Sequence, residues 1–405
     1  MKDCHIAVVL VLCLCCGARA QPLADRIPAD ALIYVGWAGT RAMGPKFETS
    51  HLRTMIDASN FIAVYEMLLP ALIERAGAEE PEAVAPLQLI GRLGGSLWRH
   101  PSAFYLGEVD PKSRLPAMAL LIDADQDSAD LEASIEQLIA EIGAIPIPPQ
   151  VRRREGLVAL TIGPVSKQLE ALISPEGGAD APAIAGETAF RSALKQVSPE
   201  PAAVVYANIR GAVAMIDRLV EADGNPRRTE DWQIPRDAFG LGGLHQLIWT
   251  GSFVDRKWAT HAFVQAPAPR RGLAILLDAP PLDDSALDML PKSTRWGTVG
   301  RFDFVRLFDE VRAGLERAEP DKVDQFDQGM EQVSAMLELN VRDDLLAALG
   351  DTWATYIDRE VGGTTQLGWW CTTACATGPR LTRRFSVLSS WPTACSARWA
   401  AATTR

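Results

Sequence analysis

Three aspartates at alternate positions are the residues of this sequence that most resemble the start of a metal site. Asp123, Asp125 and Asp127 alternate along the chain, and calcium loops begin in this way because hard cations prefer several oxygen ligands. The sixth position of such a loop is here Ser128 rather than glycine, and the twelfth is Ser134 rather than glutamate. The same string also suits a strand end that leads into a helix, where acidic side chains favour the helix dipole. We therefore expect no metal site, with calcium at the three aspartates as the one alternative.

No other spacing in the sequence indicates a known chemistry. The histidines after residue 20 lie far apart, and no two have the spacing of zinc ligands on one helix; they are His51, His100, His245 and His261. Residues 21–360 contain no cysteine, which excludes a thiolate nucleophile or thiolate metal site there. Ser96 follows two glycines but lacks the spacing of a nucleophile elbow. We expect no catalytic residues and no bound cofactor.

The first twenty residues have the pattern of a secretory signal peptide. Lys2 provides a positive charge, the stretch 6–16 is apolar, and Ala18-Arg19-Ala20 matches a cleavage site. The apolar stretch is too short to span a bilayer. We expect export and cleavage after Ala20, which places the mature chain in the periplasm or outside the cell, with no membrane span of its own.

Charge is distributed unevenly along the chain. The whole sequence has a net charge of −11. The first twenty residues hold two basic side chains and one acidic, and residues 361–405 hold five arginines and no acid, which leaves −17 for residues 21–360. Such an acidic body excludes nucleic acid as the main partner, because phosphate binding requires basic patches.

Hydrophobic periodicity predicts an α+β fold, with mostly antiparallel sheets and flanking helices. Apolar residues three and four apart predict amphipathic helices over 304–315, 131–142 and 323–337. Apolar runs bounded by turn residues predict strands between them; these are 31–37, 103–109, 117–122, 157–162, 202–208, 246–254, 258–265 and 353–358. Short connections favour hairpins at 254–258 and 110–113.

Short similarities indicate two related modules at the ends of the body. Ile27-Pro28-Ala29-Asp30 and Leu290-Pro291-Lys292-Ser293 each precede a strand and then a helix, and Gln88–Leu93 resembles Asp344–Leu349. We expect a first module over 21–180, a central strand, helix and hairpin segment over 181–269, and a second, truncated module over 270–363.

Residues 364–405 differ from the body. From residue 361 onward there is no aspartate, glutamate or lysine, while three cysteines and four of the eleven tryptophans occur there. The second module also ends one strand earlier than the first. We expect an aberrant, disordered tail, and hypothesise that a shifted reading frame produced it.

The body resembles a known family. The motifs are Ile27-Pro28-Ala29-Asp30-Ala31, Gly240-Leu241-Gly242-Gly243-Leu244, the run 266–273 and Leu349-Gly350-Asp351-Thr352-Trp353. They are similar to those of domain-of-unknown-function family 3352 of exported bacterial proteins, over roughly residues 27–360. The resemblance implies export but no activity, so it assigns no functional residues.

Three classes of function are compatible with this sequence. The missing catalytic motifs favour an exported, non-catalytic domain that binds a protein or an envelope component. The alternatives are a small-ligand-binding protein and an extracytoplasmic enzyme whose site assembles between modules. A pocket with converging polar groups would favour the alternatives, and a wide exposed apolar patch would favour the first class.

Overall fold

A computed structural model describes most of the chain. The described residues are 21–79, 84–110, 115–142, 147–164, 167–173, 181–198, 200–294, 296–357 and 369–373. They belong to two compact units. Unit 1 takes in the chain up to Gly224 together with Leu244–Gln265, and unit 2 consists of Asn225–Gly243 and the chain from Ala266. Among the described residues, every helix is too short or too polar to cross a bilayer.

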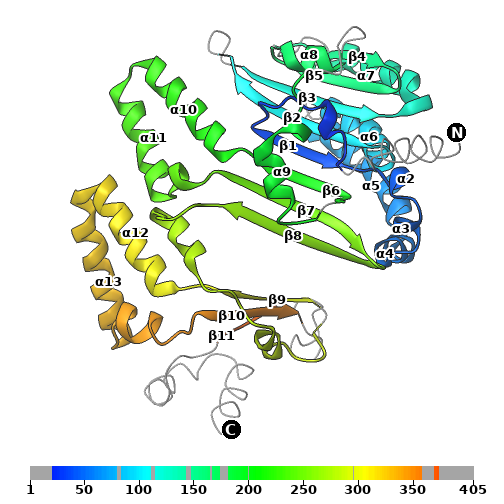
Figure 1. Ribbon diagram of the computed structural model, residues 1–405. Coiled ribbons are helices and arrows are strands. Elements are labelled where there is room, and N and C mark those ends of the chain that lie inside the picture. The colour runs from blue at the N-terminus through cyan, green and yellow to red at the C-terminus, as the bar shows by residue number, and fades with distance from the viewer. Residues whose placement is uncertain are drawn as a thin grey trace, which may run out of the picture. The chain divides into compact units, whose positions relative to one another are not determined.

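Unit 1 is built on one eight-stranded antiparallel sheet, in the order β4-β5-β3-β2-β1-β6-β7-β8 (Figure 1). Its strands are β1 (Ile33–Trp37), β2 (Ser102–Val109), β3 (Pro116–Asp123), β4 (Gln150–Arg154), β5 (Leu157–Ile162), β6 (Ala203–Ala207), β7 (Gln246–Val254) and β8 (Lys257–Gln265). Its helices are α2 (Thr40–Met43), α3 (Pro45–Glu48), α4 (His51–Ser59), α5 (Phe61–Glu79), α6 (Val84–Arg99), α7 (Ser128–Ile142), α8 (Lys167–Ile173), α9 (Thr188–Leu194) and α10 (Ile209–Asp223), with 3-10 turns η1 (Ala24–Arg26), η3 (Asp125–Asp127) and η4 (Ile184–Gly186).

The main core lies between one face of this sheet and helices α8 and α9. Alternate residues of the strands point into it, as period-two patterning requires. Phe190 of α9 is fully buried, and its ring meets the rings of Tyr34 and Tyr206 edge-on at centroid distances of 5.9 Å and 5.1 Å. Both tyrosine hydroxyls are hydrogen-bonded, that of Tyr206 to the side chain of Gln246 at 3.0 Å. The three rings fix α9 across the two central strands.

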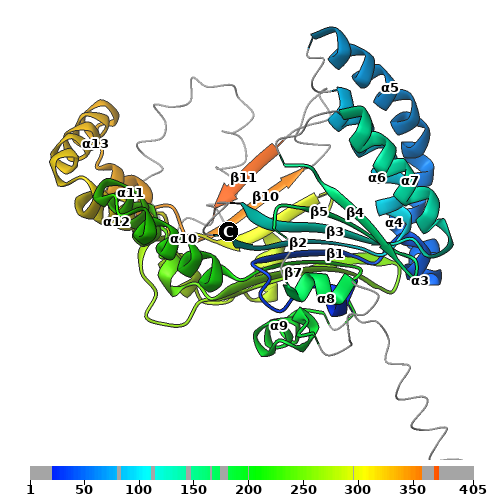
Figure 2. The ribbon, with the colours of Figure 1, turned by 90° about the horizontal axis from the view of Figure 1, so that it is seen from above.

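The second face of the sheet is also apolar. One row across six strands consists of Leu160, Leu120, Phe104, Val35, Val205 and Trp249, each opposite the next. A sheet that is apolar on both faces needs cover on both. Helices α6 and α7 supply that cover over β3 and β5, where Leu93, Leu131 and Ile135 are buried against the sheet. Figure 2 shows α6 and α7 on one side of the sheet and α8 and α9 on the other.

Unit 2 contains a three-stranded antiparallel sheet in the order β11-β10-β9 and a set of helices. Its elements are α11 (Pro226–Ala238), η5 (Leu241–Gly243), η6 (Gly272–Asp278), η7 (Asp284–Met289), β9 (Trp296–Arg301), α12 (Phe304–Ala318), η8 (Pro320–Lys322), α13 (Val323–Leu337), the π-helical turn η9 (Val341–Leu346), β10 (Thr352–Ile357) and β11 (Trp369–Thr373). Arg312 of α12 forms a bidentate ion pair with Asp327 of α13, its Nε and Nη2 donating to the two carboxylate oxygens at 2.9 Å and 2.6 Å.

The same order of one strand, a set of helices and two further strands occurs three times along the chain. It is formed by β1, β2 and β3, by β6, β7 and β8, and by β9, β10 and β11, and in each set the middle strand of the sheet is the second in sequence. The first set (β1, β2, β3) and the last set (β9, β10, β11) also align their strands in a similar way, with the middle strand contributing an alanine between its two neighbours. Gly36 faces Ala103, which faces Leu121, and Val299 faces Ala354, which faces Thr372. The three sets thus have the same strand order, and the expected relation between the two ends of the chain stays a prediction.

The predicted α+β class is confirmed, and each predicted strand and helix listed above is present, with ends displaced by at most three residues. The hairpin between β7 and β8 is present and turns at Asp255 with φ 54°. Strands β2 and β3 pair antiparallel, while residues 111–114 between them lie outside the described residues. The chain divides differently from the expected modules. Three strands of the segment 181–269 belong to the same sheet as the first module, and Ile184 lies in the main core, so the expected boundary at 180 lies inside unit 1.

The signal segment and most of the tail lie outside the described residues. Within 364–405 the structure describes only Trp369–Thr373, which form β11 and pair with β10 from Trp353 to Ile357. A paired strand here differs from the disorder expected of the tail. They also occupy the place where the second module was expected to lack a strand. The hypothesis of a shifted reading frame stays a prediction.

Candidate functional site

The three alternating aspartates are separated by the local backbone. Asp123 ends β3, Asp125 begins η3 in the left-handed region with φ 48°, and the Asp127 carboxylate is bound by Arg41. Over the described residues, no three side chains among His, Cys, Asp and Glu are grouped closely enough to hold a metal ion. The calcium alternative therefore has no support in the geometry, because its oxygens do not converge.

A hollow of about 460 Å³ lies in unit 1 between α6 and α7. Its lining combines a buried aliphatic wall with charged and hydroxyl groups, namely Arg41, Leu93, Ser96, Arg99, His100, Asp127, Asp130, Leu131, Ser134, Ile135 and Leu138. The volume is within the range of small-molecule pockets. Two residues singled out in the sequence, Ser96 and His100, thus meet Asp127 in one place.

Asp127 is the centre of the charged group. Its Oδ2 accepts a hydrogen bond from Arg41 Nη1 at 2.9 Å and lies 3.3 Å from Nε2 of His100, whose side chain is only 5 % exposed. The hydrogen bond from Arg41 lowers the pKa of Asp127, and burial together with the charge of Arg41 lowers the pKa of His100. At neutral pH the aspartate is therefore charged and the imidazole neutral, with Nε2 in position to donate to the carboxylate.

This arrangement lacks the contacts of a nucleophilic site. A serine nucleophile needs a hydrogen bond from its hydroxyl to its base, and in the part of the chain that is described none joins the Ser96 hydroxyl to the His100 ring. The two residues are joined only by their backbones, the N–H of His100 donating to the oxygen of Ser96 at 2.9 Å. Ser134 donates its hydroxyl to the backbone oxygen of Asp130 at 2.7 Å. The polar groups of the hollow are mostly bound to one another, so the geometry gives no support to hydrolytic chemistry.

Helix α5 exposes apolar side chains that the sequence analysis missed. Met67, Leu68 and Leu72 are 71 %, 52 % and 45 % exposed, and Val64, one turn before Leu68, is also exposed. These four residues, which we call the arm face, follow a spacing of three, four and eight and so lie on one side of the helix. Met55 of the neighbouring α4 is exposed as well. Four exposed large apolar side chains on one helix are unusual for a protein without a partner.

The opposite side of α5 packs on α6. Leu69 fits against Gly91, where even a methyl group would approach its side chain to 2.3 Å, and Ile73 is half-buried one turn later. Figure 2 shows α5 outside α6, on the side away from the sheet. Helix α5 is therefore apolar on both sides and covered on one. A helix that is apolar all round is normally buried. The apolar residues of 61–73 were therefore the sequence signal that α5 has two sides to cover.

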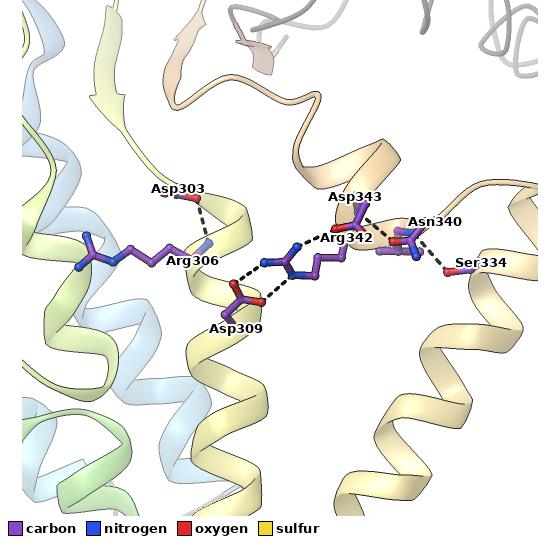
Figure 3. Close-up of polar contacts among 8 residues, drawn as sticks. Asp303, Arg306, Asp309, Ser334, Asn340, Arg342 and Asp343 are labelled. Carbon is purple, nitrogen blue, oxygen red and sulfur yellow. Dashed lines mark hydrogen bonds and ion pairs between the residues drawn. The ribbon is translucent and has the colours of Figure 1, made fainter.

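Unit 2 holds a second polar cluster, drawn in Figure 3. Arg342 of η9 donates from Nε and Nη2 to the two carboxylate oxygens of Asp309 on α12, both at 2.7 Å, and from Nη1 to Asp343 at 2.6 Å. Asn340 caps the turn by accepting from the backbone N–H of Asp343 at 2.8 Å. These groups bind one another, so the cluster fastens η9 to α12 and offers nothing to a ligand.

Comparison of the chain with family models, with characterised proteins and with solved structures finds no match. The resemblance to the exported bacterial family therefore stays a prediction.

Proposed function

We propose that this chain is an exported, non-catalytic protein that binds another protein through the arm face of α5. The single observation that carries this proposal is the exposure of Val64, Met67, Leu68 and Leu72 on one side of a helix whose other side is packed. Such a helix face matches the way apolar anchors at helical spacing dock into a groove of a partner.

A protein partner agrees better with the charge of this region than a membrane does. The sequence of the helix contains Glu66, Glu74 and Glu79 against Arg75 alone, and the body as a whole is strongly acidic. Amphipathic helices that bind anionic lipid carry lysine and arginine beside the apolar face. The arm face instead suits a groove that is apolar at its centre and neutral or basic at its rim.

Burial of the arm face would supply part of the free energy of a specific complex. Complete burial of a leucine or methionine contributes about 1.5–3 kcal/mol. Side chains about half exposed would therefore contribute roughly 1 kcal/mol each, and the four together about 4 kcal/mol before ordering costs. Because the same side chains are already outside the core, replacing them leaves most folding contacts intact.

Photo-crosslinking in cells that express the full chain tests this function. A photoreactive amino acid at position 68 or 72 should give one discrete adduct, while the same group at Arg191, an exposed residue of α9 on the other side of the sheet, should not. The adduct at 72 should disappear when Leu68 is replaced by Glu, with the melting temperature lowered by no more than a few degrees. Equal labelling at 68, 72 and 191, or no adduct at any of them, contradicts the proposal.

A further inference from the structure

His100 is a buried titratable group that the fold holds in one place. It follows the last residue of α6, and its backbone N–H donates to the oxygen of Ser96 at 2.9 Å. Its side chain is only 5 % exposed. Gly39, just before α2, lies so close that a methyl group there would be 2.3 Å from the carbonyl carbon of His100. A proton taken up by this imidazole therefore adds a charge to a closely packed site.

The permanent charges around His100 balance one another. The hollow that it lines is also lined by Arg41 of α2, Arg99 of α6, Asp127 of η3 and Asp130 of α7, so two guanidinium groups face two carboxylates. Protonation of the imidazole would leave this group with one positive charge in excess. Burial and the charges of Arg41 and Arg99 lower the pKa of His100, while the charge of Asp127 raises it. The proton is therefore the one variable charge of the site below neutral pH.

A single carboxylate oxygen faces both the arginine and the histidine. Asp127 Oδ2 accepts from Arg41 Nη1 at 2.9 Å and lies 3.3 Å from His100 Nε2. A protonated imidazole donates to a carboxylate more strongly than a neutral one. The Arg41 side chain is 57 % exposed, and ion pairs so exposed contribute little to stability. Movement of Arg41 into water is therefore the easiest way for the site to lose its excess charge.

We propose that this cluster is an acid-sensitive switch, in which His100 takes up a proton from solvent, binds Asp127 Oδ2 in place of Arg41, and releases Arg41 into solvent. The contact between Arg41 and Asp127 joins α2 to η3. Its release frees α2, the first of the helices that lead from β1 to α5. The switch uses α2, α6 and η3 and not the arm face, so this inference stands independently of the proposed protein partner.

An NMR titration of the full chain from about pH 8 to about pH 4.5, on both sides of the ordinary histidine pKa, tests the proposal. The Arg41 side-chain signal and the amides of α2 should shift with the same midpoint as the His100 ring. His100→Gln should abolish these shifts, whereas His261→Gln, which replaces an exposed histidine of β8, should leave them unchanged.

Two arginine variants separate the exchange of partners from simple repulsion. Arg41→Gln should raise the His100 midpoint, because the competing cation is gone, and should remove the α2 shift. Arg99→Gln should also raise the midpoint but keep the Arg41 and His100 signals coupled, because Arg99 donates to the backbone oxygen of Gly95 and not to Asp127. Since Arg41 is exposed, its replacement leaves the core intact, and the test does not depend on replacing the buried histidine.

Three results would overturn the proposal. An Arg41 signal that stays constant while His100 titrates would mean that both cations share Asp127. A His100 midpoint that is unchanged or lower in Arg41→Gln would mean that the two groups do not compete. An α2 shift that persists in His100→Gln would assign the acid response to a carboxylate instead of the imidazole.

Discussion

Gly39 determines how closely α2 approaches the end of α6, and its replacement gives the sharpest test of unit 1. Its φ is +76°, a value that L-residues rarely adopt. A Cβ at this position would lie 2.3 Å from the carbonyl carbon of His100 and 2.7 Å from the carbonyl oxygen of Arg99. These are backbone atoms, so no side-chain rotation relieves the clash. Backbone strain of about 1–3 kcal/mol and overpacking of about 1–3 kcal/mol together predict that Gly39→Ala destabilises by about 2–6 kcal/mol.

Two other glycines provide matched controls. Gly44 has φ +51°, but no atom lies within 4 Å of the place that a methyl group would take there, so Gly44→Ala should show the strain alone, about 1–3 kcal/mol. Gly186 has open space and no positive φ, so Gly186→Ala should be neutral or slightly stabilising, by up to about 1 kcal/mol.

Urea unfolding of the three variants, followed by circular dichroism, should therefore rank Gly39→Ala as the most destabilised and Gly186→Ala as the least. Because Arg41 lies two residues after Gly39, the first variant should also disturb the contact between Arg41 and Asp127, visible as a shift of the His100 ring resonances. Equal midpoints for Gly39→Ala and Gly44→Ala would refute the close approach of the two backbones.

Other consequences are open to direct measurement. Phe190→Ala removes a fully buried ring and should cost about 3–5 kcal/mol, seen as a lower denaturation midpoint; a loss below about 1 kcal/mol would contradict the described core. Because the pKa of His100 is lowered on folding, its stabilising effect is complete above the unfolded value near 6.5 and is lost as pH falls from there through the folded pKa. Unfolding free energies should therefore fall less steeply below pH 6.5 in His100→Gln, and an NMR titration midpoint of His100 above 6.5 would be the wrong sign. N-terminal sequencing of the exported protein should begin at Gln21, and intact material starting at Met1 would exclude cleavage there.

Most of the sheet could be predicted from the sequence because its strands are short apolar runs bounded by turn residues. The run 246–254 and its hairpin partner are examples, and both have the predicted ends within one residue. The edge position of β4 was also predictable, since Arg152 and Arg153 prevent pairing with another sheet. What the sequence did not show was which strands are neighbours, because β1 and β6 meet only through tertiary packing.

The hollow and the arm face escaped prediction for different reasons. Asp127 was noticed for its spacing from Asp125, but its actual partners, Arg41 and His100, come from elements remote in sequence. Helix α5 was missed because it has no single apolar stripe, which is the signal that identifies amphipathic helices. The central repeat did have a signal: Leu241-Gly242-Gly243 precedes β7 as Leu93-Gly94-Gly95 precedes β2.

The pairing of β1 with β6 affects the order in which unit 1 can fold. β1 is first in the chain and central in the sheet, and its residues 33–37 pair with 203–207. Contacts of such high sequence separation form slowly, because the long intervening chain loses loop entropy first. Until β6 arrives, one edge of β1 has no strand beside it, and an open apolar edge pairs readily with other chains. During synthesis, the nascent chain therefore requires protection from aggregation until at least residue 207 has emerged.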